Sequence, residues 1–410
     1  MSAANQPFLP YGRQLIEDDD VAAVVSVLRG DMLTTGPAVD AFERAFAEAV
    51  GARYAVSCSS GTAALHLATL ALGLEPGDAA IVPSLTFLAT ANAVRYVGAE
   101  VVFADVDPDT GLLTPETLEA ALGRAAARKV KVRAVLPVHL NGQCVDMPSV
   151  QAVTERHGLA IVEDACHALG GAYGAAGDEG RPVGSCPYAA MAIFSLHPVK
   201  VIAAGEGGVV TTNRDDLAAS AARFRNHGMV RRADAFENRR LAFAASGVAN
   251  PWYYEMPEPG FNYRASDIHC ALALSQLKKL ARFVRARAAL VQRYDDRLAD
   301  LAPLVRPIGR VPGCQPAWHL YPVLIDFASA GIERGEAMTR LAAAGIGTQV
   351  HYLPVHRQPY YERRYGALAL PGADTYYDRV LSLPLFAAMT EQQVDRVVDA
   401  LRALFMGGGR

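Results

Sequence analysis

The chain has 410 residues, of which 51% are hydrophobic and 20% charged, and its formal net charge is −3. This length predicts one large and one smaller domain of an ordinary globular protein. The charge balance gives no electrostatic basis for binding nucleic acid or an anionic membrane. Residues 1–10 lack the basic and apolar regions of a signal peptide, and no apolar run could span a bilayer, so we expect a cytoplasmic protein.

The six cysteines lie far apart in the sequence, and none belongs to a CxxC pair. That spacing predicts reduced thiols and disfavours a zinc site. His139, His167 and His197 fall near strand ends, but none forms a ligand-like i, i+4 pair around a carboxylate. We therefore expect no bound metal.

The first half of the chain alternates between helical and strand patterns. Helical spacing covers residues 18–30, 39–50, 61–72 and 91–96. Short apolar runs typical of buried strands lie at 54–58, 80–83, 101–104, 134–138, 160–163 and 190–194. This alternation predicts an α/β fold with a mainly parallel central sheet and helices on both faces.

Residues 228–259 show no sustained periodicity, which predicts a long loop, and long loops in compact enzymes are often functional. After it, residues 266–299 read as one long helix. The remaining patterns are strand-like at 322–326 and 347–352 and helical at 333–344 and 391–404. We therefore predict a large domain of residues 1–265 and a smaller C-terminal α+β domain of residues 266–410.

The first motif with chemical meaning is a turn of small residues at a predicted helix start, residues 59–65. Exposed N–H groups at this helix start, together with the helix dipole, would favour a phosphate. Ser, Thr and Gly at a helix start are also ordinary N-caps, which is the alternative.

The second motif is residues 161–167, in which a buried apolar strand ends in two carboxylates, Glu163 and Asp164. Open α/β sheets bind ligands at this end of their strands. Asp164 could pair there with a protonated pyridine nitrogen and make the ring an electron sink. The alternative is an N-cap for the following helix.

The third motif is the sequence FSLHPVK, residues 194–200, followed by a glycine-rich stretch at 203–208. A lysine held in a buried site loses its proton readily and can form a Schiff base, although most lysines lie on solvated surface. The glycines would let the backbone approach a flat cofactor.

The three motifs occur in the order of the aspartate-aminotransferase (type I) fold of enzymes that depend on pyridoxal 5′-phosphate (PLP). Asp164 and Lys200 are 200 − 164 = 36 residues apart. The chain resembles the DegT/DnrJ/StrS sugar aminotransferases nearly from end to end. The resemblance includes the stretches SSGTAALHL, EDACHALG, FSLHPVK, GFNYRASDIHCALALSQLKKL and HYLPVH.

The resemblance implies a role for each matching residue at the cofactor. Lys200 matches the Schiff-base lysine, which favours transamination over the dehydration carried out by relatives with His at that position. Asp164 matches the partner of the pyridine nitrogen, and His167 lies beside the phenolic oxygen. Phe87 matches a ring that stacks on the pyridine, with a core aromatic as the alternative. The remaining matches are phosphate contacts: Gly61, Thr62 and Ser195.

The resemblance also implies a homodimer with shared active sites. Asn262 matches a residue that reaches the phosphate of the neighbouring subunit, and the alternative is that it caps a helix beginning near Ser266. The substrate contacts implied by the resemblance are Thr35, Gly36, His319, His351 and Tyr352.

Within the family, residues 252–256 and the later HLYPV and HYLPVH stretches are most similar to aminotransferases of pseudaminic acid biosynthesis. Those enzymes aminate C4 of a UDP-linked 4-keto-6-deoxy-N-acetylhexosamine, with L-glutamate as the donor. The alternatives are a dTDP- or GDP-linked keto-sugar aminated at C3 or C4, and a non-catalytic regulator on the same fold. Candidates for the nucleotide phosphates, with a solvated loop as the alternative, are Arg231, Arg232, Arg239 and Arg240.

The sequence departs from the family pattern at three places. Leu196 stands where Phe is common, and Cys166 stands where Ala is common. Both are small changes in packing. Extra residues around 174–181 would either reshape the rim of a pocket or lengthen a surface turn.

Overall fold

The computed structural model describes residues 7–174 and 180–406, so most of the predicted insertion at 174–181 lies outside the described residues. A seven-stranded sheet has the order β1-β9-β8-β5-β4-β2-β3. The five strands from β8 to β3 are parallel, and β9 runs antiparallel to both β1 and β8. The strands are β1 (Tyr54–Cys58), β2 (Asp78–Pro83), β3 (Glu100–Ala104), β4 (Lys131–Val135), β5 (Ala160–Asp164), β8 (Met191–Ser195) and β9 (Gly208–Thr212). The predicted fold class is confirmed.

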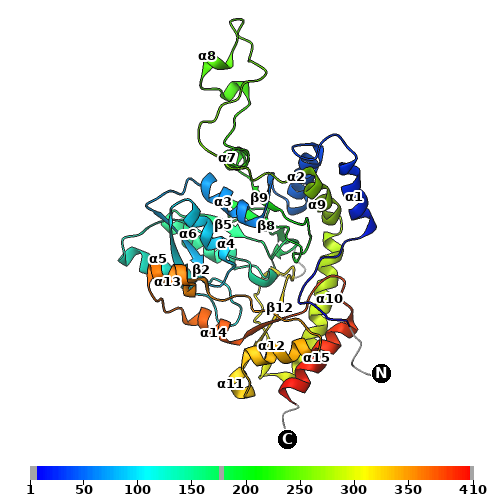
Figure 1. Cartoon of the computed structure of the whole chain (residues 1–410). Helices are drawn as coiled ribbons and strands as arrows, with labels where there is room; N and C mark the ends of the chain where they lie inside the picture. Colours follow the sequence, from blue (N-terminus) through cyan, green and yellow to red (C-terminus); the bar gives the residue numbers. More distant parts are fainter. Residues whose placement is uncertain (1–6, 175–179, 407–410) are drawn as a thin grey trace.

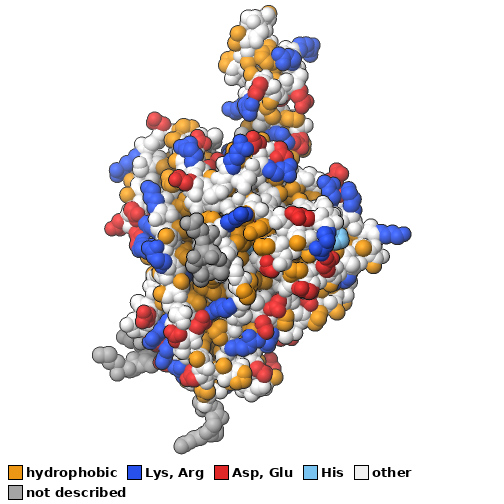
Figure 2. All heavy atoms as spheres, turned by 180° about the vertical axis from the view of Figure 1, so that it is seen from behind, with side chains coloured by type: hydrophobic (Ala, Val, Ile, Leu, Met, Phe, Trp, Pro, Cys, Tyr) orange, Lys and Arg blue, Asp and Glu red, His pale blue; other side chains and the backbone are white. Residues whose placement is uncertain are grey.

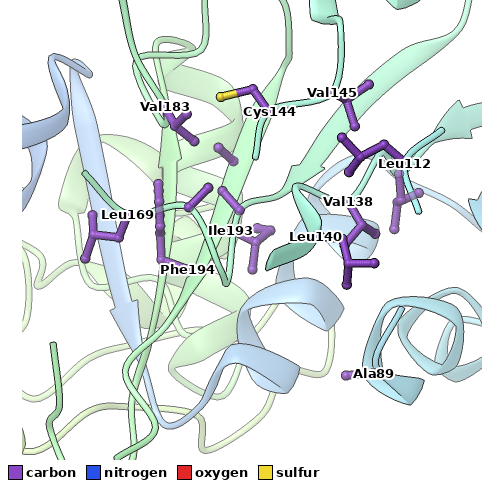
Figure 3. Close-up of a cluster of buried hydrophobic side chains, with 14 of the residues drawn as sticks. Ala89, Leu112, Val138, Leu140, Cys144, Val145, Leu169, Val183, Ile193 and Phe194 are labelled. Carbon is purple, nitrogen blue, oxygen red and sulfur yellow. The ribbon is translucent and has the colours of Figure 1, made fainter. Parts of the chain in front are cut away.

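The strands are apolar because both faces of the sheet are covered. Every residue of β2 and of β9 is buried. The covering helices include α3 and α4, which pack on each other, and α5 and α6, which do the same. Their bounds are α3 (Gly61–Ala71), α4 (Leu88–Tyr96), α5 (Pro115–Ala127), α6 (Met147–His157) and α7 (Asp215–Arg225). Figure 3 shows part of the resulting core, with Ile193 and Phe194 of β8 among its members.

The N-terminal helices α1 (Asp18–Leu28) and α2 (Pro37–Val50) pack on α9 (Asp267–Leu277), and α10 (Leu280–Leu298) leads to the C-terminal part (Figure 1). The prediction of one helix over 266–299 is wrong at its middle, where the chain turns between α9 and α10. At this turn the Lys279 ammonium lies 2.5–3.1 Å from Glu17, Asp19 and Asp20. The acidic start of α1 thus has a cationic partner at the break.

The C-terminal part contains an antiparallel sheet of order β10-β12-β13. The strand predicted at 347–352 is wrong, because there only Gln349 forms a bridge, to Ser382 of β13. The elements are β10 (Val305–Pro307), β12 (Tyr321–Ile325), β13 (Val380–Leu383), α11 (Phe327–Ala330), α12 (Arg334–Ala343), α13 (Pro359–Tyr365), α14 (Pro371–Arg379) and α15 (Glu391–Phe405), with short 3₁₀ helices at Ala299–Leu301 and Val355–Arg357. The division of the chain near residue 265 remains a proposal.

A third sheet, of order β11-β6-β7, joins the two parts of the chain. β6 (Ala172–Tyr173) and β7 (Arg181–Pro182) follow β5, whereas β11 (Cys314–Gln315) follows β10. A 3₁₀ turn, η2 (Leu140–Gly142), lies between β4 and α6.

Residues 228–259 form an arm that projects from the body of the molecule and contains α8 (Arg239–Ala242) and a 3₁₀ turn at Ala233–Ala235 (Figure 1). Its two sides are bridged at Val230 and Glu255. Large apolar side chains are exposed on the arm (Figure 2). Among them Trp252 is 74% exposed. Within the described residues, no helix is long and apolar enough to cross a membrane.

Candidate active site

A cavity of about 600 Å³ opens at the carboxyl ends of β5 and β8. Most of the side chains predicted for the site line it: Gly61, Thr62, Phe87, Asp164, His167, Ser195, Lys200, His319, His351 and Tyr352. A second cavity, of about 620 Å³, lies along the outer edge of β3 and contains none of these residues. The first cavity is therefore the candidate active site.

Lys200 is the only one of the five lysines of the chain that lines this cavity. Its side chain is half-buried, and in the described parts of the chain its ammonium makes no hydrogen bond or ion pair. Burial lowers the pKa of Lys200, while nearby Cys166 and Asp164 raise it, and the balance is a lowered pKa. Such a lysine is neutral more often than a surface lysine and is a better nucleophile and base.

Asp164 ends β5 and is 5% exposed. Its Oδ2 accepts a hydrogen bond of 2.6 Å from Thr90 Oγ1, and its Oδ1 accepts one of 3.2 Å from the N–H of Cys166. Among residues 7–174 and 180–406 no cationic side chain forms an ion pair with it. A buried carboxylate held in this way is suited to a cationic ligand atom such as a protonated pyridine nitrogen.

Thr90, on α4, was not predicted as part of the site. Its hydroxyl also lies 2.7 Å from that of Thr86, which precedes the N-cap of α4. The only hint of this role in the sequence is the i, i+4 spacing of two threonines after the end of β2. Nothing in that spacing points to Asp164, which lies 74 residues away.

His167 is buried against the rings of Tyr352 and His319, and its ring centroid is 4.4 Å from that of His319. Its Nδ1 accepts a hydrogen bond from the backbone N–H of Asn141, which assigns the proton to Nε2, 3.2 Å from the Tyr352 hydroxyl. Burial, and then the charge of Lys200, hold the pKa of His167 well below its usual value. The ring is therefore a neutral donor at neutral pH.

The start of α3 is suited to a phosphate. Ser60 caps the helix by accepting from the N–H of Ala63, which leaves the N–H groups of Gly61 and Thr62 without a partner in the described residues. Ser195 of β8 lies beside them, because a Cβ on Gly61 would be only 2.8 Å from the Ser195 Cβ. Glycine at position 61 is what allows β8 and α3 to approach this closely.

Phe87 is 56% exposed and lies at the cavity, with its ring centroid 6.1 Å from that of Tyr352. The alternative that it is a core aromatic is therefore wrong. An exposed ring on the cavity wall is available to stack on a flat ligand.

The five predicted substrate contacts fall into two groups. His319, His351 and Tyr352 line the cavity, and the buried Nδ1 of His319 has no hydrogen-bond partner in the described residues. Burial and then Lys200 lower the pKa of His351 to about 3. The structure does not bring Thr35 and Gly36 to this cavity: they lie at the start of α2, where the N–H of Gly36 donates to Asp267 at 2.8 Å.

Asn262 does not line the cavity of its own chain, and its side chain is exposed. The alternative that it caps α9 is wrong, because the Ser266 side chain accepts from the N–H of His269 and is the cap. The four candidate arginines lie on the exposed arm, where Arg232 pairs with Asp234. None of the four lines the cavity formed by this chain.

Comparisons with known proteins agree with this geometry. Residues 14–402 match the model of the DegT/DnrJ/EryC1/StrS aminotransferase family. The spore coat polysaccharide biosynthesis protein SpsC of Bacillus subtilis is 39% identical over 403 residues, covering 98% of each chain.

Two solved structures are similar over nearly the whole chain. Helicobacter pylori PseC, an aminotransferase involved in pseudaminic acid biosynthesis, superposes with a TM-score of 0.86 at 28% identity and covers 98% of this chain and 100% of its own. The PLP form of the putative sugar aminotransferase Spr1654 from Streptococcus pneumoniae gives 0.84 at 26% identity, covering 98% and 99%. Spr1654 is also known in a pyridoxamine phosphate form. The chain therefore belongs to the DegT/DnrJ/EryC1/StrS aminotransferase family and is a PLP-dependent sugar aminotransferase.

Proposed function

We propose that Lys200 holds PLP covalently in this cavity. The observation that carries the proposal is that the single lysine of the cavity shares it with Asp164 and the start of α3. The N–H groups of Gly61 and Thr62 and the Ser195 hydroxyl would bind the phosphate, and Asp164 would hold the protonated ring nitrogen. Phe87 would cover one face of the ring, and neutral His167 would donate to its phenolic oxygen.

PLP, when bound, supplies a pyridine ring that withdraws electrons from the carbon that carries the amino group. The proton transfer belongs to Lys200. With its pKa lowered by burial, its amine can take the proton from Cα of the amino donor, for which we propose L-glutamate, and return a proton at the end of the transfer. Asp164, held in place by the hydrogen bond from Thr90, would keep the ring nitrogen protonated.

For the acceptor, we propose C4 of a UDP-linked 4-keto-6-deoxy-N-acetylhexosamine. The similarity to PseC over all of that chain supports this substrate. His319, with its unpartnered Nδ1, and His351 and Tyr352 provide the polar cavity wall on which the sugar would lie. The higher identity to SpsC, a protein of spore coat polysaccharide biosynthesis, makes other nucleotide-linked keto-sugars the second candidate.

We also propose a homodimer with shared active sites. Asn262 is exposed and absent from the cavity of its own chain, as expected of a residue that serves a partner's cavity. The arm exposes the apolar side chains of Trp252, Tyr254 and Met256. Burial of these side chains between two subunits would stabilise a dimer. Thr35 and Gly36, which lie beside α9 and not at the cavity of their own chain, would likewise serve the partner's cavity.

The substrate is tested by incubating the enzyme and L-glutamate with UDP-, GDP- and dTDP-linked 3- and 4-keto-sugars and measuring the rate of 2-oxoglutarate release. The proposal predicts the highest kcat/KM with the UDP-4-keto-N-acetyl sugar. A dTDP- or GDP-linked substrate that is turned over faster would replace that acceptor. A cofactor band that does not shift on addition of glutamate would instead favour a non-catalytic regulator.

A further inference from the structure

Cys144 and Cys314 lie in contact although they are 170 residues apart in the sequence. Cys144 follows η2 and is buried in the apolar cluster beside Val145 and Val183 (Figure 3), whereas Cys314 is half-buried on β11. The N–H of Cys144 donates to Cys314 Sγ at 2.9 Å. The register of the third sheet places Cys314 opposite Tyr173, and Cys144 Sγ lies 3.6 Å from the carbonyl oxygen of neighbouring Ala172.

The other cysteines are arranged differently. Cys58 and Cys166 each donate to a backbone carbonyl, and Cys186 lies between Gly184 and Thr211. Within residues 7–174 and 180–406, no other two cysteines share a hydrogen bond. The same residues place no third histidine, cysteine or carboxylate with the Cys144–Cys314 pair at metal-ligand distances, so the pair is not a metal site.

The two thiols differ in character. Hydrogen bonding from Cys144 lowers the pKa of Cys314 despite its partial burial. The same contact and then burial raise the pKa of Cys144. Cys314 is thus the thiol of the pair with the lowered pKa and belongs to the less buried residue, and both properties favour reaction with oxidants.

We propose that Cys144 and Cys314 form a reversible disulfide when the enzyme meets a peroxide. The Cys314 thiolate attacks one oxygen of hydrogen peroxide, the O–O bond breaks, and a sulfenic acid and hydroxide form. Cys144 sulfur then attacks Cys314 sulfur, the S–O bond breaks, and the departing hydroxide takes up a proton. In total two thiols lose two electrons and two protons, and one peroxide becomes two waters.

The disulfide would join two segments next to the active site, one that carries His319 of the cavity wall and one that contacts His167. Beyond Cys314, the N–H of Ala317 donates to Gly142 and the N–H of His319 donates to Asn141. Asn141 also orients His167 through its own N–H. These two segments, joined by hydrogen bonds, hold His319 and His167 at the cavity. The covalent link would fix the two segments to each other at one end.

The test uses the holoenzyme treated with hydrogen peroxide, with free thiols alkylated before digestion by trypsin. Cys144 is the only cysteine of the peptide 134–156, and Cys314 is the only cysteine of the peptide 311–334. The proposal predicts that these two peptides appear joined, with a mass two hydrogens below their sum, and that dithiothreitol separates them.

Variants identify the pair. Cys314→Ser, at the half-buried position, must abolish the joined peptide, and Cys144→Ser must do the same if it folds. Cys186→Ser, a buried cysteine bonded elsewhere, is the matched control and must leave the joined peptide in place. A wild-type enzyme whose Cys144 and Cys314 are both still alkylated after peroxide treatment, or whose joined peptides involve other cysteines, overturns the proposal.

Discussion

Asp164 is the residue whose charge the proposed reaction depends on most. Asp164→Asn keeps the shape of the side chain but removes the charge that would hold the pyridine nitrogen protonated. We expect kcat to fall by at least ~100-fold, the order seen when a preorganised electrostatic partner is removed. Steady-state kinetics with saturating PLP measure this, and a rate near that of the wild type would exclude the role of Asp164.

Thr90 provides a graded version of the same test. Thr90→Val removes the hydroxyl that donates to Asp164 Oδ2, and a hydrogen bond to a charged group contributes roughly 1.5–3 kcal/mol. We expect a rate loss of about tenfold or more, on the basis of 1.4 kcal/mol per factor of ten. Thr154→Val is the control, because Thr154 is buried on α6 and bonds only within its helix. Equal losses in the two variants would mean that the effect of Thr90 is structural.

The buried histidines of the cavity predict how stability depends on pH. Burial lowers the pKa of His167 and His319 well below the usual value and that of His351 to about 3. As pH falls below about 6.5, the unfolded chain binds protons at these positions and the folded chain does not, so unfolding is favoured. With its pKa near 3, His351 alone can contribute up to about 2 kcal/mol between pH 6.5 and 5.

We therefore expect the melting temperature, at saturating PLP, to decrease from pH 7.5 to pH 5. His351→Gln should flatten this slope, whereas His157→Gln, at an exposed position on α6, should leave it unchanged. A melting temperature independent of pH in this range, or one that rises on acidification, would contradict the assignment of neutral buried histidines.

At the scale of elements, the junction of α3 and β8 is sterically defined. Gly61→Ala would place a methyl group 2.8 Å from the Ser195 Cβ and separate the helix start from the strand end. Such overpacking costs about 1–3 kcal/mol, and we expect PLP affinity to fall by about tenfold or more. Gly123→Ala, on α5, meets nothing within 4 Å and is the matched control, with affinity unchanged. Absorbance titration of the apoenzymes with PLP measures both, and equal affinities would show that this junction does not bind the phosphate.

The sequence predicted most of the parallel strands from their short apolar runs, but it placed one strand at 134–138, whereas β4 covers Lys131–Val135 and begins with alternating charged residues. It did not reveal β9, whose GVVTT follows directly on a glycine-rich stretch. The break between α9 and α10 was missed because its ion pairs with α1 join residues more than 250 positions apart. Asp164 and Lys200, which belong to two separate motifs, line one cavity. Thr90 and the buried hydrogen bond from Asn141 to His167 were not predicted, since periodicity carries no information about such distant pairs.

At the scale of the whole molecule, the proposed shared sites predict complementation between two defective chains. Lys200→Ala and Asn262→Ala, each impaired alone, would be dissociated, mixed and re-formed as heterodimers. If Asn262 serves the partner's cavity, one site of each heterodimer collects both defects and the other is intact, so activity should partly return. A mixture that never exceeds the better single variant, despite demonstrated subunit exchange, would show that each cavity is built from one chain.

The most direct test of the central claim is reduction of the holoenzyme with borohydride, followed by proteolysis and mass spectrometry to locate the trapped cofactor. We expect PLP on Lys200. In a folded Lys200→Ala protein we expect neither trapped cofactor nor turnover. The other four lysines are the internal controls, because none of them lines the cavity. Trapped cofactor on Lys129, Lys131, Lys278 or Lys279, or a Lys200→Ala protein that retains activity, would contradict the central claim.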